Sequence, residues 1–257
     1  MQTVILAGGL GTRLRPLTEQ TPKPMVEVEG RPFLEFIVEY IAGQGFRDIL
    51  LLTGHLGEHV SDHFGDGRRF GVSIRYSREQ QPLGTGGAIR AAWEQLADDF
   101  LLLYGDSFLP IDYVDVASAF HRASWPAMVV TYDNQTGYTD VLNNIAVDAS
   151  GCVTRYEKGV SDPQLKYVDA GALCIRRDAL AALPEGRAVS LVSPDDRDLL
   201  RRMERIVDIS GLGVEVVGGG YDLYAARTAE TRAAAERALG EAKKDVSRAA
   251  AEAQRRT

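Results

Sequence analysis

The sequence predicts an α/β protein with a doubly wound, mostly parallel sheet. Short apolar runs alternate with stretches of helical periodicity in the first half of the chain, which is typical of parallel strands joined by helices. Glycine-containing motifs follow several of the apolar runs, as they do at the ligand-binding edge of such a sheet. A chain of 257 residues, 45% hydrophobic and 25% charged, can bury one sizeable core.

The first half of the chain carries the alternating pattern. Strands are expected at residues 3–6, 48–53, 72–76 and 100–104, and helices at 33–42, 58–64 and 88–96. Leu6, Tyr76 and Tyr104 end three of these strands, and a motif follows each of them. Because the carboxyl ends of parallel strands share one edge, we expect the motifs to meet there. This half is therefore predicted to be Rossmann-like.

The second half has shorter, strand-rich pieces without long helices between them. Its strands are expected at residues 127–132, 144–148, 153–156 and 168–175. We expect them to complete the sheet and to form a smaller lobe. The prediction is a single domain over 1–226, with halves 1–126 and 127–226.

An alanine-rich, charged helix is expected at residues 227–257. The last 33 residues hold 12 alanines, and their larger apolar side chains are Leu239 and Val246. Such a helix lacks an apolar face wide enough for burial in a core. Two alternatives stay open, a frayed helix and a helix packed on a partner subunit of a homo-oligomer.

Composition disfavours several classes of function. The formal net charge of −7 argues against nucleic acid as the main ligand, because a phosphate backbone requires a basic face. No apolar stretch approaches the ~20 residues that cross a bilayer, so a membrane role is not expected. The chain has two cysteines, Cys152 and Cys174, and no leader pattern precedes the first strand. We expect a cytoplasmic protein with reduced thiols.

A glycine-rich run, LAGGLGTRLRPLT at residues 6–18, begins where the first strand ends. Gly8, Gly9 and Gly11 lack a Cβ, so their backbone N–H groups can turn toward phosphate oxygens. The run fits neither the dinucleotide fingerprint G-x-G-x-x-G nor the P-loop G-x-x-x-x-G-K-[ST]. This disfavours a dinucleotide-dependent oxidoreductase. For the glycines alone, an ordinary turn remains the alternative.

Two cations accompany the glycines. Arg13 can clamp a terminal phosphate through two parallel hydrogen bonds. Lys23 lies between Pro22 and Pro24 and is a point charge suited to a phosphate whose charge shifts during reaction. Together with the glycines, they predict nucleotide chemistry at the amino terminus.

This run resembles that of the sugar-1-phosphate nucleotidyltransferases, also called nucleotide-sugar pyrophosphorylases. Elements similar to those of the family follow in the expected order: Pro82 to Ala88, Gly105-Asp106, Glu157-Lys158, Val168 to Gly171 and Tyr221-Asp222. The resemblance implies the nucleotide-diphospho-sugar transferase fold. It makes 1–126 the nucleotide-binding half and 127–226 the sugar-binding half.

The resemblance also implies roles for individual residues. The catalytic residues are expected to be Arg13, Lys23 and Asp106. The nucleotide is expected to contact Leu6, Ala7, Gly8, Gly9, Gly11, Thr12, Glu79, Pro82, Gly84 and Thr85. The sugar 1-phosphate is expected to contact Asn144, Glu157, Lys158, Asp169 and Gly171. Mg²⁺ is the expected cofactor, held by Asp106 and Asp222, since carboxylates and phosphate oxygens are its usual ligands.

Each of these assignments has a plainer alternative. Asp106 could cap a helix, Glu157-Lys158 could be a solvated ion pair, and Asp169 with Gly171 could form a turn between strands. Tyr221-Asp222 is followed by Leu223-Tyr224, whereas the family has a small or hydroxyl residue and glycine there. A catalytically weak regulatory subunit is therefore a second function to weigh.

Glu79 suggests which base is bound, since it lies five residues before Gly84, where the resemblance places the base-contacting side chain. Guanine presents two adjacent donors, which a carboxylate can accept together, whereas the other bases match an amide better. GTP is thus favoured, and Gln80 or Gln81 would favour UTP or dTTP if the register differs. Within the family, the chain most resembles guanylyltransferases acting on D-glycero-D-manno-heptose 1-phosphate. A uridylyl- or thymidylyltransferase acting on a hexose 1-phosphate is the alternative.

Overall fold

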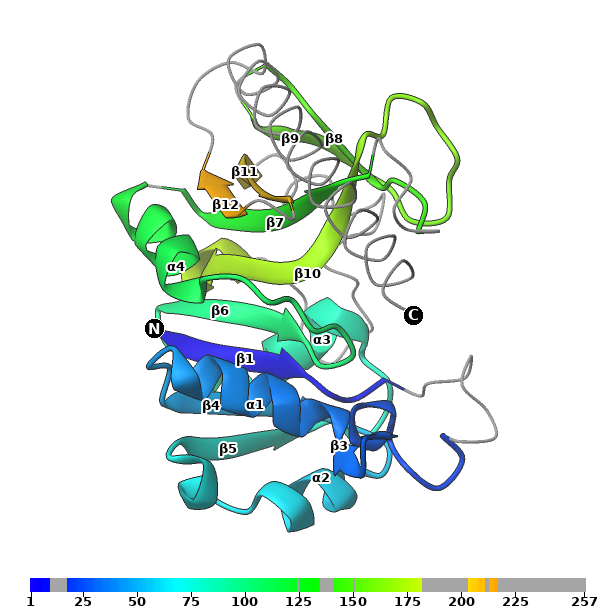
Figure 1. Ribbon diagram of the computed structural model, residues 1–257, viewed down its shortest axis with the longest axis vertical. Helices are drawn as coiled ribbons and strands as arrows, with labels where there is room; N and C mark the ends of the chain where they lie inside the picture. The colour runs from blue at the N-terminus through cyan, green and yellow to red at the C-terminus, as the bar shows by residue number, and fades with distance from the viewer. Residues whose placement is uncertain are drawn as a thin grey trace, which may run out of the picture.

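The computed structural model describes residues 1–9, 18–123, 125–134, 141–149 and 151–181, and the backbone of strands at 203–210 and 213–216. One mixed sheet dominates it, with strand order β12-β11-β7-β10-β6-β1-β4-β5 (Figure 1). Its parallel part is formed by β1 (Gln2–Leu6), β4 (Asp48–Thr53), β5 (Ser73–Arg78) and β6 (Asp99–Tyr104). The carboxyl ends of these four strands meet at one edge.

Helices cover both faces of the sheet. One face carries α1 (Phe33–Gly43), α2 (Gly57–Phe64) and α4 (Tyr113–Arg122), and the other carries α3 (Gly84–Ala91). The strands are apolar on both sides: Ile5 and Leu51 face the first layer, while Val4 and Leu50 face the second. This arrangement confirms the predicted doubly wound, mostly parallel α/β fold, and it explains why the strands are continuous apolar runs.

The second half of the chain extends the same sheet. Its elements are β7 (Ala127–Asp133), β8 (Ile145–Val147), β9 (Val153–Tyr156), β10 (Tyr167–Arg176), β11 (Met203–Ser210) and β12 (Gly213–Val216). β10 runs antiparallel between β6 and β7, and it also pairs with β8 of the β8–β9 hairpin. The sheet therefore continues across the predicted boundary at residue 126, and the two-half division stays a prediction.

Short elements complete the fold. A hairpin of β2 (Glu27–Val28) and β3 (Arg31–Pro32) precedes α1, and single helical turns occur at η2 (Lys23–Met25), η3 (Arg68–Phe70), η4 (Trp93–Gln95) and η5 (Arg177–Leu180). In the described ranges, no helix has the length and apolar character needed to span a membrane. Both cysteines are free thiols. The helix expected at 227–257 lies outside the described residues.

Two expectations are corrected. The helix expected at 88–96 begins earlier, at Gly84, and ends at Ala91 before the separate turn η4. Glycine has low helix propensity, but here Gly86 and Gly87 are buried, and this packing overrides their propensity. The alternative of a turn at Asp169 and Gly171 is also wrong, because both lie inside β10.

Candidate active site

The strand ends are drawn together by backbone contacts. The N–H of Gly105 donates to the carbonyl oxygen of Leu6 at 2.9 Å, and the N–H of Ala7 donates to that of Leu52 at 2.8 Å. A Cβ on Gly105 would lie only 2.5 Å from the Leu6 oxygen, so glycine is needed for β6 to approach β1 this closely. The chain thus leaves β6 close to the carboxyl end of β1.

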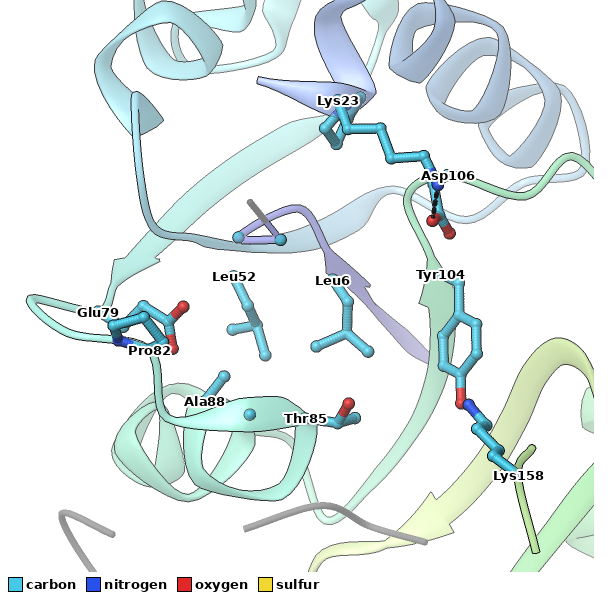
Figure 2. A pocket seen from close by; sticks show the side chains of 14 residues that line it. Leu6, Lys23, Leu52, Glu79, Pro82, Thr85, Ala88, Tyr104, Asp106 and Lys158 are labelled. Atoms are coloured by element: carbon cyan, nitrogen blue, oxygen red, sulfur yellow. Dashed lines mark hydrogen bonds and ion pairs between the residues drawn. The ribbon is translucent and has the colours of Figure 1, made fainter. Parts of the chain in front are cut away.

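A pocket of about 540 Å³ opens at this edge (Figure 2). Its lining residues come from separated segments: Leu6, Gly8, Gly9, Lys23, Pro24, Leu52, Glu79, Pro82, Gly84, Thr85, Ala88, Tyr104, Asp106 and Lys158. Figure 2 shows Glu79 and Pro82 at one end, and Tyr104 with Lys158 at the other. Asp106 lies above Tyr104 in this view, and the side chain of Lys23 reaches toward it.

Lys23 and Asp106 form an ion pair at the mouth of the pocket. The Lys23 Nζ lies 2.5 Å from the Asp106 Oδ2, and the two side chains are 29% and 38% exposed. Asp106 does not cap the next helix, because the side chain of Asp112 accepts the N–H groups of Val114 and Asp115 there. The carboxylate of Asp106 is therefore available to the pocket.

The described residues fit a site for Mg²⁺ at Asp106. Mg²⁺ in phosphate sites is usually held by one or two carboxylates together with substrate oxygens and water. Asp106 supplies such a carboxylate in the pocket that Gly8 and Gly9 also line. No cluster of three or more His, Cys, Asp or Glu side chains occurs in the described ranges, so a metal there would depend on the substrate. The second expected ligand, Asp222, lies outside the described residues.

Glu79 is held rigidly at the far end of the pocket. Its Oε2 accepts the N–H of Leu83 at 3.0 Å. Its Oε1 packs between Gly8 and Gly54. A side chain at either position would be too close, because its Cβ would lie 3.0 Å from Oε1 at Gly8 and 2.8 Å from it at Gly54. Burial raises the pKa of Glu79, and the Leu83 N–H opposes this rise. The result is a fixed, partly desolvated acceptor.

The opposite wall is built from two tyrosines and an aspartate. The Oδ2 of Asp169 accepts the hydroxyls of Tyr104 at 2.8 Å and of Tyr156 at 2.7 Å. Burial, and then the nearby charge of Asp169, raise the pKa of both tyrosines. The Nζ of Lys158 lies over both rings, 5.3 Å from the Tyr104 centroid and 5.7 Å from that of Tyr156.

Two predicted sugar contacts are engaged in structural bonds. Arg155 binds Glu157 through two bonds of 2.9 and 2.8 Å and reaches Asp162 at 2.5 Å. The side-chain oxygen of Asn144 accepts the N–H of Asp169 at 2.9 Å, and Asn144 is only 6% exposed. Both groups stabilise the wall from behind, and neither is among the residues that line the pocket.

The structure gathers most of the predicted site. The predicted residues that line the pocket are Leu6, Gly8, Gly9, Lys23, Glu79, Pro82, Gly84, Thr85, Asp106 and Lys158. Those that lie beside it without lining it are Ala7, Asn144, Glu157, Asp169 and Gly171. Gly11, Thr12, Arg13 and Asp222 lie outside the described residues.

Four lining residues are absent from the predicted site: Pro24, Leu52, Ala88 and Tyr104. Tyr104 had a detectable signal, because it ends an apolar strand directly before Gly105-Asp106. Ala88 also had one, because it ends the motif that begins at Pro82. Leu52 had none, because an apolar side chain near a strand end is ordinarily part of the core. Its role depends on a crevice that only the assembled sheet defines.

Comparisons with known proteins identify the family and the fold. Residues 2–172 match the family described as nucleotidyl transferase, which is more than half of the chain. The chain belongs to the nucleotidyl transferase family. A putative glucose-1-phosphate thymidylyltransferase from Bacillus anthracis has the same fold, with a TM-score of 0.71 over 90% of this chain and 95% of that one at 21% identity. The nucleotide-diphospho-sugar transferase fold expected from the sequence is thereby confirmed.

Curated relatives are similar over part of their length. A D-glycero-alpha-D-manno-heptose 1-phosphate guanylyltransferase of Campylobacter jejuni is 43% identical over 112 residues, covering 44% of this chain and 50% of that protein. A mannose-1-phosphate guanylyltransferase of Mycobacterium tuberculosis is 33% identical over 192 residues, covering 74% and 53%. Other relatives are named as uridylyl- and thymidylyltransferases. The chain spans about half the length of the first of these relatives.

Proposed function

We propose that the chain is a sugar-1-phosphate nucleotidyltransferase, which joins a nucleoside triphosphate to a sugar 1-phosphate and releases pyrophosphate. One observation carries the proposal. A single pocket presents two lysines, Lys23 and Lys158, and the carboxylate of Asp106 along one side, and a fixed carboxylate acceptor, Glu79, at its far end. Such a site can hold two anionic groups side by side and a base at a distance from them.

The positions of the charged groups suggest which part of each substrate they bind. The triphosphate would lie against the backbone of Gly8 and Gly9, with Lys23 beside the α-phosphate. Lys158 would neutralise the phosphate of the sugar. A phosphate oxygen of the sugar 1-phosphate then attacks the α-phosphorus in line, and the bond to pyrophosphate breaks. Arg13, by resemblance, would stabilise the charge that develops on pyrophosphate.

The reaction needs no general base. The attacking phosphate is already ionised near neutral pH, so no proton has to be removed from it. The described part of the pocket lining contains no histidine. His55, His59 and His121 are exposed, and His63 lies 2.7 Å from Glu35 on the surface.

Mg²⁺ belongs to the proposal as well. Held by Asp106, and by Asp222 as the resemblance implies, it would neutralise phosphate charge during transfer. In the free protein the Lys23 ammonium neutralises Asp106. The Lys23 ammonium has three N–H donors, so it could bind a phosphate oxygen while it remains beside Asp106.

GTP is the proposed nucleotide. No donor among the residues that the structure describes bonds to the Oε1 of Glu79, and the Oε2 keeps a lone pair beyond the one used by Leu83. A guanine could donate its N1–H and 2-amino hydrogens to these two oxygens. The guanylyltransferase names of the two relatives described above support the same base.

D-glycero-D-manno-heptose 1-phosphate is the proposed sugar substrate. The support is the name of the Campylobacter relative and of a second relative from Aneurinibacillus thermoaerophilus. Mannose 1-phosphate is the competing substrate, because the mycobacterial relative covers more of this chain. The expected cytoplasmic location and homo-oligomer stay predictions that this proposal does not use.

The test is a matrix of pyrophosphate-release assays with Mg²⁺, four nucleoside triphosphates and a panel of sugar 1-phosphates. Release that needs both substrates supports the transferase, and its largest kcat/KM identifies the pair. Asp106→Asn should lose most turnover and require more Mg²⁺, while the fold remains intact by circular dichroism. Nucleotide binding without turnover for any pair would overturn the proposal in favour of a regulatory subunit.

A further inference from the structure

We infer that Asp169 is a positioning residue: it fixes Tyr104 and Tyr156 as an aromatic platform for Lys158, and does not itself bind the sugar. This inference deepens the proposed function and rests on it for the identity of the anion. It also replaces the earlier expectation for Asp169, which was a direct contact with the sugar 1-phosphate.

The bonding capacity of Asp169 is largely used inside the protein. A carboxylate offers about four acceptor positions. Three of them are taken, by the hydroxyls of Tyr104 and Tyr156 on Oδ2 and by the N–H of Gly171 on Oδ1. The backbone N–H of Asp169 is bonded to Asn144 as well. Asp169 is thus fixed from four directions, with little capacity left for a sugar hydroxyl.

The backbone of β10 is shaped around one of the rings. Pairing between β10 and β7 shifts register between Asp169 and Leu173, and Gly171 lies in this interval with a φ of +83°. A Cβ on Gly171 would lie 3.2 Å from the Tyr104 ring, so glycine gives the ring its room. The irregular stretch of β10 therefore brings one carboxylate under two phenols that lie on β6 and β9.

The aromatic platform positions the ammonium of Lys158 without pairing its N–H groups with a carboxylate. In the described part of the chain, the ammonium of Lys158 lies over the two ring faces and no carboxylate pairs with it. The nearby Glu157 and Asp162 are neutralised by Arg155 instead. The three N–H groups of Lys158 can therefore bind an incoming phosphate.

The carboxylate acts on Lys158 through the rings. A phenol that donates to a carboxylate is fixed in orientation, and the bond polarises it so that the ring face becomes more negative. Both effects keep the ammonium over the rings before the substrate arrives. Without Asp169, the rings lose their common anchor and the free ammonium samples more positions, which weakens phosphate binding.

The experiment uses the full chain and titration calorimetry with the sugar 1-phosphate that the wild type binds best. Asp169→Asn keeps the shape but cannot accept all three bonds, and we expect ~10-fold weaker sugar 1-phosphate binding with GTP affinity within about twofold. Tyr104→Phe should give a smaller loss in the same direction. Tyr113→Phe is the matched control, because Tyr113 is also buried but donates to Leu109 in a region outside the pocket. It should bind both ligands as the wild type does.

A double-mutant cycle separates positioning from simple destabilisation. If Asp169 acts through Lys158, adding Asp169→Asn to Lys158→Met weakens binding no further than Lys158→Met alone. Additive losses, or unchanged sugar 1-phosphate affinity in both Asp169→Asn and Tyr104→Phe, would overturn the inference. An equal loss for GTP and sugar 1-phosphate would also overturn it, since that is the result of general disorder in the pocket.

A second measurement does not depend on the substrate. The rate of acylation of Lys158 is measured by mass spectrometry and divided by the rate for Lys166, which serves as internal reference. This ratio should be higher in Asp169→Asn than in the wild type. Unchanged relative labelling overturns the positioning role. The wild type could bind no sugar 1-phosphate while the acylation of Lys158 relative to Lys166 still changes in Asp169→Asn. The proposed function would then be wrong, and the positioning role of Asp169 would still hold.

Discussion

The two sides of the pocket are built differently. The phosphate side has glycine backbone and one ion pair, Lys23–Asp106, with both side chains about one-third exposed. The sugar side has a connected network in which one aspartate anchors two buried phenols and one arginine holds two carboxylates. On the phosphate side one bond joins two charged groups, whereas on the sugar side several bonds join the aspartate and the arginine to their partners.

This difference matches what each side must do in the proposed reaction. Charge moves from the α-phosphorus to pyrophosphate, so cations that follow it must exchange partners. The sugar phosphate keeps its position during attack, so its binding group benefits from being fixed in advance. The comparison predicts that substitutions on the phosphate side reduce kcat, and that substitutions on the sugar side raise KM.

The largest effect is expected for Lys23→Met. It removes the cation nearest the proposed α-phosphate, and loss of one preorganised group commonly lowers the rate ~10²- to 10³-fold. Because Lys23 acts mainly in the transition state, kcat should fall while the KM for sugar 1-phosphate stays within about threefold. Steady-state pyrophosphate release measures both values.

Arg68→Ala is the control for loss of a surface cation. Arg68 is 89% exposed and pairs with Asp66 away from the pocket, so its substitution should leave kcat unchanged. If Lys23→Met raises KM and spares kcat, the distinction between the two sides fails.

The next effect concerns the base. Glu79→Gln replaces two acceptors by one acceptor and a donor, and we expect ~10- to 100-fold lower kcat/KM for GTP, since hydrogen bonds to charged groups contribute about 1.5–3 kcal/mol. UTP or dTTP should gain relative to GTP. Asp112→Asn is the acidic control, because its carboxylate caps α4 and lies outside the pocket. An unchanged ratio of GTP to UTP would show that Glu79 does not contact the base.

The pKa of Glu79 adds a test by pH. Burial raises this pKa above its ordinary value of 4.5, so the folded state binds the proton more tightly than the unfolded state. Stability therefore falls as pH rises from 4.5 through the raised pKa. Glu79→Gln should melt at a higher temperature than the wild type at pH 7, and the difference should disappear below pH 4.5. A wild type that is more stable than the variant at pH 7 would contradict this sign.

Sequence reasoning predicted the parts of the site that follow from local pattern. Strand ends with glycines predicted the shared edge, and Lys23, Glu79 and Asp106 all lie in one pocket there. These positions follow from alternation and topology, which are readable along the chain.

The sugar side was not predictable in the same way. Glu157 and Asp169 were expected to face the substrate, yet the structure engages them with Arg155 and with two tyrosines. Whether a carboxylate is free or already bonded depends on partners brought by other strands, and that information appears only when β6, β9 and β10 are assembled. The role of Tyr156 was hidden for the same reason.

The smallest effect is expected for Arg155→Met. Arg155 forms ion pairs with Glu157 and Asp162. The pKa of Asp162 is below its ordinary value, first because the backbone N–H of Gln164 donates to it and second because Arg155 does. These side chains are 25–33% exposed and lie behind the wall, so we expect only a ~2- to 5-fold rise in KM for sugar 1-phosphate, with kcat unchanged. Arg75→Met, which breaks a comparable surface pair with Asp48, should change neither value. A rise in KM as large as that of Lys158→Met would mean that Arg155, or the Glu157 it releases, contacts the substrate. The bonds of the sugar side would then change during the reaction, as those of the phosphate side do.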